Sequence, residues 1–449
     1  MTIYTEWAVF AGGFDAATTV NATTGIPSDS NDLTSRTKTI VVDHQIMFGQ
    51  VGNASCSVTF DNTDGALTPG GGGTFSATDW FQQPLFIAPK ADTSDPPGFV
   101  AQDPGTTNLP TNVPYFVGPI TDVDHTDDGF TSTVTFKAVD WLSYMARLTY
   151  TSAWSATDER LPAVMLDALP LASGSFPKWG ASLLVKLPLA RADEEWEHLT
   201  QSGAVGDYAG DAVARAIAAD GGIMFAGFTS FAGGTTTVIY YQDGIERRRL
   251  AKNPSTAVEL VFEEADNLGT TDLPFRNLDV GFNNERIITH AEVTREGGSS
   301  QSSAADATAA KYGPRSITVG NTPHVDDTAA SDLATFYTSR FDQVVFAPRS
   351  LEVTGAMIQN YCNDAAIDVV KHLMASNTYE WGALFGETKV TWTGAGASSQ
   401  TAAVLPFRTQ MVATPEDWTM RLTFRDATNF GGFILDSNEQ GILDTNRLT

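Results

Sequence analysis

The sequence predicts an α+β fold that is rich in β-strands, with its helices gathered mainly in the middle of the chain. Three observations lead to this expectation. Short segments that alternate apolar with small or polar residues recur toward both ends. Clusters of Gly, Asp, Asn and Pro separate them. One alanine-rich segment is closed by two glycines, as a helix would be. The chain has 449 residues, 42% of them hydrophobic, and at roughly 100–200 residues per domain it should form two to four domains.

The first third of the chain is expected to form strands joined by turns. Strands are predicted at 37–42 and 54–60 because their apolar residues alternate with small or polar ones. Turn residues follow at 61–65, and four glycines at 70–73 extend this segment. An apolar run occupies 85–89, and residues 91–114, rich in Asp, Pro, Thr and Gly, predict a long loop.

The clearest hairpin comes next. Its strands are predicted at 115–124 and 131–136, around a turn at 126–129. Asp140 is a plausible N-cap for a short helical or irregular segment that ends near Met145.

The middle of the chain is more helical. Helices are predicted at 158–169, with Pro162 in the first turn, and at 212–219, closed by Gly221 and Gly222. Further strands are expected at 235–242, 260–262 and 287–293.

The last third returns to strands after two helical candidates. Residues 297–309 predict an exposed loop, 331–340 a helix, and 356–374 a helix that its β-branched residues weaken. Strands are expected at 350–354, 389–392, 410–413 and 419–424.

The two ends of the chain share a faint pattern. A strand near 120 leads through an acidic turn to Val134-Thr135-Phe136-Lys137 and Asp140, and a strand near 412 leads through Thr414–Asp417 to Leu422-Thr423-Phe424-Arg425 and Asp426. Two similar β-barrel domains in one chain would produce this echo. Hairpins of any β-rich protein would also look alike, so both explanations stay open.

The charge excludes several classes of function. The chain has 53 acidic and 27 basic residues and a net charge of −26. Such a surface repels phosphate backbones and anionic membranes. No apolar run approaches the roughly 18 residues of a membrane helix, and the first residues predict no secretory signal. Cys56 and Cys362 are best explained as reduced thiols of a protein that folds in a cytoplasm.

Motifs that carry chemistry are missing from the sequence. It contains no G-x-x-x-x-G-K-[ST], no H-E-x-x-H and no G-x-S-x-G. The histidines, at 44, 125, 198, 290, 324 and 372, are scattered. We therefore predict no catalytic residues, no cofactor and no metal site, and leave any ligand-binding residues open.

Two acidic segments are the nearest approach to a metal site. Asp122, Asp124, Asp127 and Asp128 could ligate calcium, but they lack the spacing of a calcium loop, so aspartates in a hairpin explain them better. The segment from His324 to Asp327 is a weaker candidate of the same kind.

Two other segments could contact sugars. Glu194, Glu195 and Glu197 could serve a glycosidase as acid and base, although a solvated helix face is the simpler explanation. The aromatic pair Trp80 and Phe81 could bind a sugar, although an anchor for the neighbouring flexible segment explains the pair more simply.

Several short motifs resemble one family. Residues 60–69 resemble the strand followed by D-N-x-D-G-x-x-T-P near the start of minor tail proteins of siphophages, especially those that infect actinobacteria. Further similar segments, spread over nearly the whole chain, are 118–122, 134–142, 212–219, 225–228, 238–241, 311–316, 433–437 and 441–445. The long loop at 91–114 and the stretch 356–374 depart from the family pattern.

The resemblance implies a hub of the phage tail tip: a homotrimer whose subunits each carry two related β-barrels and helix-containing accessory domains. It implies an N-terminal barrel at 1–150, a helical middle at 151–255, a second barrel-like region at 256–355 that could continue into the C-terminus, and a β-rich region at 356–449. It also implies a non-enzymatic protein of the virion, assembled in the host cytoplasm.

The resemblance further implies other tail proteins as partners: a distal tail ring, a tape measure, and tip or fibre proteins. DNA would pass through the hub channel without specific binding, and the hub would not insert into a membrane. Two alternatives remain: a carbohydrate-binding tail module, which requires an exposed Trp80 or Trp381, and a peptidoglycan hydrolase, which requires paired carboxylates or a metal.

Overall fold

The computed structural model describes most of the chain. The described residues are 6–12, 31–45, 50–51, 53–69, 80–90, 115–160, 164, 184–186, 198–220, 223–231, 234–242, 260–282, 287–340, 346–362, 373, 388–393 and 399–426.

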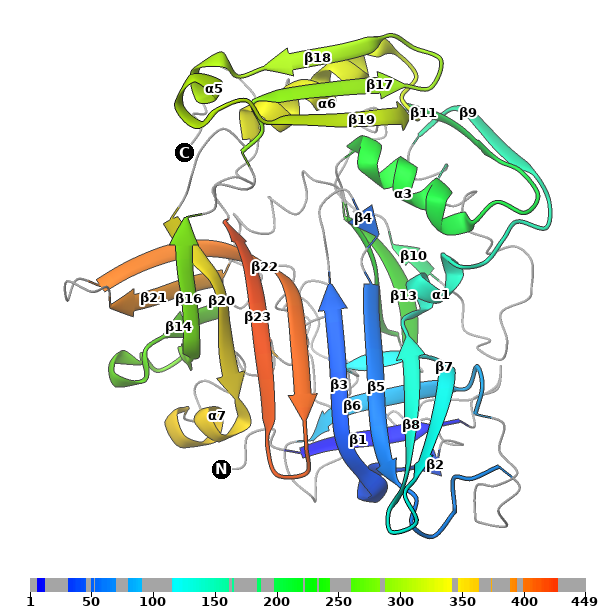
Figure 1. Ribbon diagram of the computed structural model, residues 1–449, viewed down its shortest axis with the longest axis vertical. Coiled ribbons are helices and arrows are strands. Elements are labelled where there is room, and N and C mark those ends of the chain that lie inside the picture. The colour runs from blue at the N-terminus through cyan, green and yellow to red at the C-terminus, as the bar shows by residue number, and fades with distance from the viewer. Residues whose placement is uncertain are drawn as a thin grey trace.

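Most strands lie in one 14-stranded sheet, drawn in Figure 1. These strands are β1 (Glu6–Ala11), β2 (Asn31–Asp32), β3 (Thr37–Gln45), β5 (Asn53–Asp61), β6 (Pro84–Lys90), β7 (Phe116–Asp127), β8 (Ser132–Val139), β14 (Leu260–Glu263), β15 (Leu273–Pro274), β16 (Arg276–Phe282), β20 (Phe346–Thr354), β21 (Thr388–Thr393), β22 (Ser399–Ala413) and β23 (Trp418–Asp426).

Three smaller sheets accompany it. Their strands, in spatial order, are β10 (Leu184–Lys186), β13 (Gly234–Gln242), β12 (Ile223–Phe231) and β4 (Gln50–Val51); β11 (His198–Gly203) and β9 (Trp154–Arg160); and β18 (Ser300–Ala304), β17 (His290–Arg295) and β19 (Ser316–Thr322). The described helices are η1 (Thr34–Arg36), α1 (Trp141–Met145), α3 (Ala209–Asp220), η4 (Ala265–Asn267), α5 (Asp306–Tyr312), α6 (Asp327–Arg340) and α7 (Gly355–Tyr361).

The large sheet contains the same strand order twice. In the first strand set the order is β3-β5-β8-β7-β6-β1-β2, and in the second strand set it is β16-β20-β23-β22-β21-β14-β15. Each strand of one set has the same rank along the chain as its counterpart in the other. The sets differ in two pairings: β1 pairs antiparallel with β6 and β2, whereas β14 pairs parallel with β21 and β15.

A shared irregularity fixes the alignment of the two sets. The register shifts between Ile120 and Asp122 where β7 pairs with β8, and between Pro406 and Arg408 where β22 pairs with β23. A bulge is a local feature that leaves one residue extra on one strand. With these bulges superposed, Asp122 of β7 corresponds to Arg408 of β22. The faint echo in the sequence thus coincides with a repeated topology.

The described strands form no closed barrel, so the two predicted barrels are not confirmed. The strand sets instead share one sheet, because β22 of the second set pairs with β3 of the first. The strands β16-β20-β23-β22-β3-β5-β8-β7 form what we call the central sheet, in which all neighbours run antiparallel. Its strands stand side by side in Figure 1, and β1 and β6 cross behind them.

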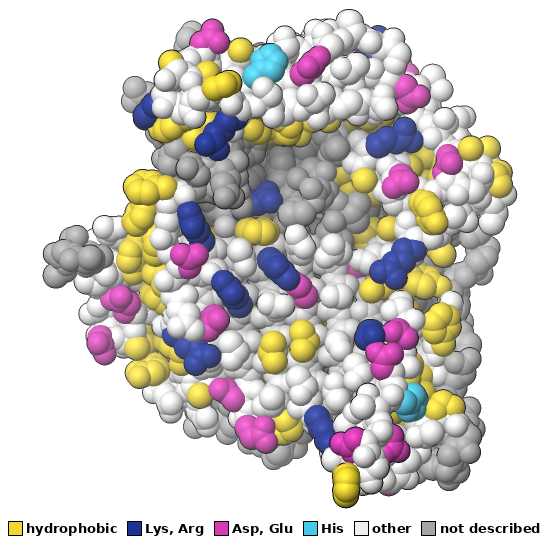
Figure 2. Space-filling model, viewed as in Figure 1, with side chains coloured by type: hydrophobic (Ala, Val, Ile, Leu, Met, Phe, Trp, Pro, Cys, Tyr) yellow, Lys and Arg dark blue, Asp and Glu magenta, His cyan; other side chains and the backbone are white. Residues whose placement is uncertain are grey.

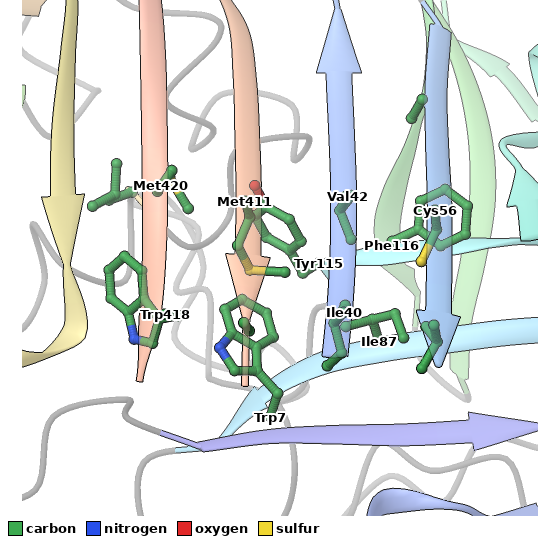
Figure 3. Close-up of a cluster of buried hydrophobic side chains, with 14 of the residues drawn as sticks. Trp7, Ile40, Val42, Cys56, Ile87, Tyr115, Phe116, Met411, Trp418 and Met420 are labelled. Carbon is green, nitrogen blue, oxygen red and sulfur yellow. The ribbon is translucent and has the colours of Figure 1, made fainter. Parts of the chain in front are cut away.

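One hydrophobic core spans both strand sets. Buried side chains from β1, β3, β5, β6 and β8 contact the same cluster as those from β20, β22 and β23. Figure 3 shows part of it, with Met411 of β22 close to Tyr115 and Trp7. Burial of so many apolar side chains from both sets makes the sheet one packing unit.

A separate layer lies beyond the end of the central sheet in Figure 1. There α6 packs on the sheet of β17, β18 and β19 around a small core of Ala291, Val293, Ala330, Leu333 and Ala334. Residues 287–340 of this layer are inserted between β16 and β20. Among the described helices, none combines the length and the apolar character needed to cross a membrane.

Most predicted elements with strong local patterns are confirmed. The strands near 40, 57, 120, 134, 238, 261, 352, 390, 411 and 421 are present, as are the helices at 212–219 and 331–340. Asp140 caps α1, since its side chain accepts a hydrogen bond from Ser143 N. The predicted helix at 356–374 begins as α7, and of its last twelve residues the structure describes only 373.

Two predicted elements are wrong. Asp158–Arg160, expected to begin a helix, belongs to β9, which pairs with β11; of residues 161–169 only 164 is described. The loop predicted at 297–309 contains β18 and the start of α5. Backbone pairing with β17 makes Ser300–Ala304 a strand although its side chains are small and polar.

The long loop predicted at 91–114, the glycine run at 70–73 and the family-like segments at 433–437 and 441–445 lie outside the described residues.

Candidate assembly interface

The junction between the strand sets is the first part of the candidate interface. The second half of β22 pairs with β3 from Arg408 opposite Gln45 to Ala413 opposite Ile40. On the core side Met411 and Val42 are opposite each other and fully buried. Two sheet edges have therefore become interior strands, and the apolar core passes beneath them (Figure 3).

An ion pair crosses the other face of this junction. The Nε of Arg408 donates to Oδ1 of Asp43 at 2.8 Å, and its Nη2 bonds the second carboxylate oxygen. The hydrogen bonds that Arg408 donates to Asp43 raise the pKa of the guanidinium above its ordinary value. A two-pronged contact of this kind fixes the register of two strands as well as stabilising them.

A buried histidine lies beside this ion pair. The ring of His44 is edge-on to Tyr115, with 5.0 Å between ring centroids. Burial lowers the pKa of His44 to about 4, because a charged imidazole would lose its hydration there. The junction is consequently built for a neutral His44.

The outer edge of β7 has no strand beside it among the described residues. Phe116–Pro119 pair with β6, but 121–127 pair only with β8 on their other side. Their side chains are half-buried or exposed. Lys137 of β8 lies between two of the aspartates, 3.0 Å from Asp122 and 2.5 Å from Asp124. This edge is therefore acidic, with one lysine in its midst.

The outer edge of β16 is the second edge that the described strands leave open, since β16 pairs only with β20. Phe282 is 62% exposed and stacks obliquely on Phe346 with 4.9 Å between centroids. The guanidinium of Arg349 lies over the Cα of Gly281 and donates to the carbonyl of Phe282 at 2.5 Å. This edge therefore combines exposed aromatic rings with charges of both signs, because β16 also carries Asp279 and Arg276, the latter in an ion pair with Glu352.

The two open edges lie at opposite ends of the central sheet (Figure 1). Figure 2 shows basic side chains with acidic ones among them over the part of this face near β16 and β20, and acidic side chains around the β7–β8 hairpin. The β7 end thus presents Asp122 and Asp124, and the β16 end presents Arg349 together with Asp279.

The acidic candidates from the sequence belong to the β7 edge and its turn. Asp127 accepts a hydrogen bond from Gly129 N, and Asp128 accepts from Phe130 N and Thr131 N. These bonds close the hairpin turn, where Gly129 has a positive φ of 81°. Within the described part of the chain, no three His, Cys, Asp or Glu side chains are grouped to hold a metal ion.

Trp80 is a core residue. It is 3% exposed, and its ring lies 5.1 Å from that of Phe136. Burial of Trp80 agrees with the anchor that the sequence favoured and excludes the alternative of an exposed sugar platform there, while Phe81 is 55% exposed. Trp381 and the glutamates 194, 195 and 197 lie outside the described residues.

His324 and its neighbours connect the inserted layer to the rest of the chain. The ring nitrogens of His324 bond Thr322 Oγ1 at 2.8 Å and the carbonyl of Ala219 in α3 at 3.1 Å. Asp326 accepts from Ala329 N, and Asp327 forms an ion pair with Arg295 at 2.6 Å. The side chains of His324, Asp326 and Asp327 thus make hydrogen bonds and an ion pair that hold the inserted layer in place.

The family-like loop at 61–69 also has a structural explanation. Asn62 is buried, donates to Thr68 Oγ1 and accepts from Leu67 N, each at 2.8 Å. Arg36 holds Asp64 with two hydrogen bonds and lowers its pKa to about 2. Both cysteines are free thiols, and burial raises the pKa of each.

Sequence reasoning missed the residues that matter most at the interface. No motif marks Asp43 and His44, which are neighbours in β3, or Arg408 in β22 and Arg349 in β20. One signal could have found two of them: a charged residue or histidine inside an apolar strand suggests a partner strand with a matching group. Once the bulges of β7 and β22 are known, aligning the two repeated segments places Asp122 at the position of Arg408.

The comparison with known proteins rests on structure. No protein-family model matches the sequence, and no curated protein matches it. A tail protein from Neisseria meningitidis MC58 has a TM-score of 0.52 at 9% identity, covering 95% of this chain and 98% of that chain. The 43 kDa tail protein of prophage MuSo2 from Shewanella oneidensis has a TM-score of 0.50 at 11% identity, covering 95% of this chain and 99% of that chain.

The chain has a tail-protein fold. The likeness extends over almost the full length of both neighbours, so it concerns the arrangement of the whole chain. At these identities it shows the fold alone. It agrees with the tail-protein resemblance of the sequence motifs, without bearing on the kind of phage.

Proposed function

We propose that this protein is a structural component of a phage tail tip. In this proposal it forms a homotrimeric hub ring that joins the tail tube to the tip and surrounds the DNA exit channel. It acts by assembly and catalyses no reaction.

The observation that carries the proposal is the repeated strand order within a tail-protein fold. Each chain brings two equivalent strand sets, so three chains bring six. A ring of three chains could then meet a sixfold tube with six similar surfaces, which is the architecture that the family resemblance implies. Closed cyclic assemblies are the usual form of homo-oligomers.

The partners follow from this role. We propose contacts with the distal tail ring, the tape measure, and tip or fibre proteins, in a virion assembled in the host cytoplasm. The first domain would be 1–150, the helical middle 151–255, and the second barrel-like region 256–355, with the β-rich region 356–449 completing it. We assign no cofactor, no metal and no membrane insertion.

The channel wall is a separate element of the proposal. A net charge of −26 would let DNA pass without being held if acidic side chains line the wall. The open face of the central sheet carries both signs, with Arg408 and Lys137 beside Asp43, Asp122 and Asp124. The acidic lining must therefore come largely from other surfaces, and a trimer map with a neutral or basic wall would refute this element.

The direct test is the mass of the purified protein in solution together with its copy number in virions. Light scattering should give three times the chain mass, and quantitative mass spectrometry of virions a multiple of three copies. Any other copy number would overturn the trimeric hub. A zymogram on cell walls, with lysozyme as positive control, should show no clearing; clearing would contradict a non-enzymatic role.

A carbohydrate-binding module is not retained as a second function. It requires an exposed ring at Trp80 or Trp381; Trp80 is buried in the core, so no specific observation favours it, and Trp381 lies outside the described residues.

A further inference from the structure

We propose that β7 of one copy pairs antiparallel with β16 of a second copy, and that this contact closes the ring. The proposal rests on the hub function and names the surface that would build it. Its partner is a second copy of this chain.

The junction inside each chain provides the precedent. There the second half of β22, the sixth strand of its set along the chain, pairs with β3, the third strand of the other set. The equivalent strands with open sides are β7, the sixth of the first set, and β16, the third of the second set. Joining these two repeats the same connection between sets, now between chains.

The bulge alignment gives the register of the proposed pair. At the junction Met411 is opposite Val42 and Val412 is opposite Val41. Carried over through the equivalent strands, His125 would be opposite Val280, Thr126 opposite Asp279, Asp124 opposite Gly281 and Val123 opposite Phe282.

Apolar groups on the core side suit this register. Val123, Leu278 and Val280 are only partly buried although they pack against the main core. Phe282 is 62% exposed. A second strand at each edge would cover these side chains, as Met411 and Val42 are covered at the junction, and apolar burial would favour the contact.

The other face brings a cation to the aspartates of β7, and Asp279 of β16 lies on that face opposite Thr126. Arg349 lies over Gly281, the position opposite Asp124 of the second copy, and Asp122 would be diagonal to it. The positions of acid and base are exchanged relative to the junction inside the chain, where β3 carries the acid Asp43 and β22 carries the base Arg408.

Charge also selects the partner. β3 and the second half of β22 are already paired on both sides within the chain, so the competing pairings are β7 with β7 and β16 with β16. Pairing β7 with β7 would bring Asp122 and Asp124 of the two copies together, and pairing β16 with β16 would bring the two Arg349 side chains to one edge. Like charges across strands are destabilising, so each set is directed to the other set and the ring alternates between them.

The open β7 edge is protected while the chain is single. Charged side chains on an edge strand discourage indiscriminate strand addition. Lys137 holds Asp122 and Asp124 in the free chain. A second copy that brings Arg349 offers these carboxylates a further cation, whereas an unrelated strand offers none.

Cross-linking between two singly substituted chains tests the register. Thr126→Cys and Asp279→Cys chains are mixed, allowed to assemble and oxidised. We expect a disulfide-linked dimer in the mixture and at most background in either variant alone, because directly opposite residues are within disulfide reach. Thr126→Cys mixed with Glu416→Cys, an exposed position on the β22–β23 turn, is the matched control.

The same samples are sized by light scattering, which separates two failures. An oligomer without the mixed disulfide overturns this interface and leaves the hub function standing. A chain that stays monomeric at every concentration overturns both.

Charge reversal provides a second test that does not need a cysteine. Asp124→Lys and Arg349→Glu should each weaken assembly by about tenfold, and the two together should recover most of it. Circular dichroism confirms that each variant is folded. Equal losses in the single variants with no recovery in the double variant would overturn the proposal.

Discussion

The second halves of β22 and β7 hold the same place in the two strand sets but have opposite surroundings. Met411 of β22 is fully buried, whereas His125, at the equivalent position of β7, is exposed. Arg408 faces Asp43 across a paired strand, whereas Asp122 at the equivalent place forms an ion pair with Lys137 of its own hairpin.

The difference teaches how one topology serves two purposes. A strand edge that is satisfied inside the chain can carry Met and Ala on its inner side, because no water reaches them. An edge that must remain soluble before assembly carries aspartates and a histidine instead. The same strand position thus forms an internal junction in one set and, in our proposal, a junction between chains in the other.

The largest expected effect comes from truncating the buried member of this pair. Met411→Ala should lower the free energy of unfolding by about 2–5 kcal/mol, because it leaves a cavity under the junction. His125→Ala, the matched control, should change it by less than about 0.5 kcal/mol. Urea denaturation followed by tryptophan fluorescence measures both, and equal losses would refute the contrast.

The next effect is a pH dependence that belongs to the junction. Below pH 6.5 the unfolded chain binds a proton on His44 that the folded chain excludes down to about pH 4. Stability therefore falls by about 3 kcal/mol as the pH drops through this window. His44→Phe should remove that fall, so the wild-type advantage over this variant should shrink by the same amount between pH 7 and pH 4.

Asp140 changes stability with pH in the opposite direction to His44. The effect of His44 must therefore be measured by comparing the wild type with a His44 variant. Burial raises its pKa from 3.8 to about 6, so the folded chain keeps a proton that the unfolded chain has lost. Its contribution weakens as the pH rises through this window. The His44→Phe chain should consequently lose stability as the pH rises from 4 to 6. A difference in unfolding free energy between wild type and variant that does not change with pH would contradict the assignment to His44.

A smaller loss of stability is expected at Gly118, where the first strand set has a glycine and the second set a larger residue. A Cβ on Gly118 of β7 would lie 1.8 Å from the carbonyl oxygen of Val139, while the equivalent residue of β22, Val404, is accommodated in the core. Gly118→Ala should cost about 1–3 kcal/mol, since the backbone must shift. Thermal unfolding would detect it, with Gly320→Ala, whose Cβ position is open, as the control.

The smallest effect is expected from the junction ion pair. A double-mutant cycle with Asp43→Asn and Arg408→Gln should give a coupling of about 0.5–1 kcal/mol, because both groups are partly exposed. A coupling near zero would mean that the pair directs the register without stabilising it.

Much of the fold was predictable because the deciding forces are local. The β7–β8 hairpin, the strand at Asn53–Asp61 and helix α3 follow from alternation, turn residues and composition. The Asp140 cap follows from one residue before a short helix. The wrong elements, Asp158–Arg160 and Ser300–Ala304, are strands only because a neighbour pairs with their backbone.

The candidate interface was predictable only in part. The sequence drew attention to Asp122 and Asp124, and they do lie on the open edge of β7. It was silent on Arg349 and Phe282, whose importance depends on which strands end up at the edges of the sheet. Trp80 was correctly favoured as an anchor, but the sugar platform stayed open as an alternative because exposure cannot be read from an aromatic residue in sequence alone.

The sequence by itself determined the β-rich class, the hairpins, the acidic surface and the faint echo between the two ends, all of which depend on neighbours in the chain. Only the tertiary structure decided that the echo is a repeated strand order joined through Asp43 and Arg408, residues 365 positions apart. The physical reason is that edge pairing depends on burial and charge brought together by the whole fold, and no local pattern encodes them.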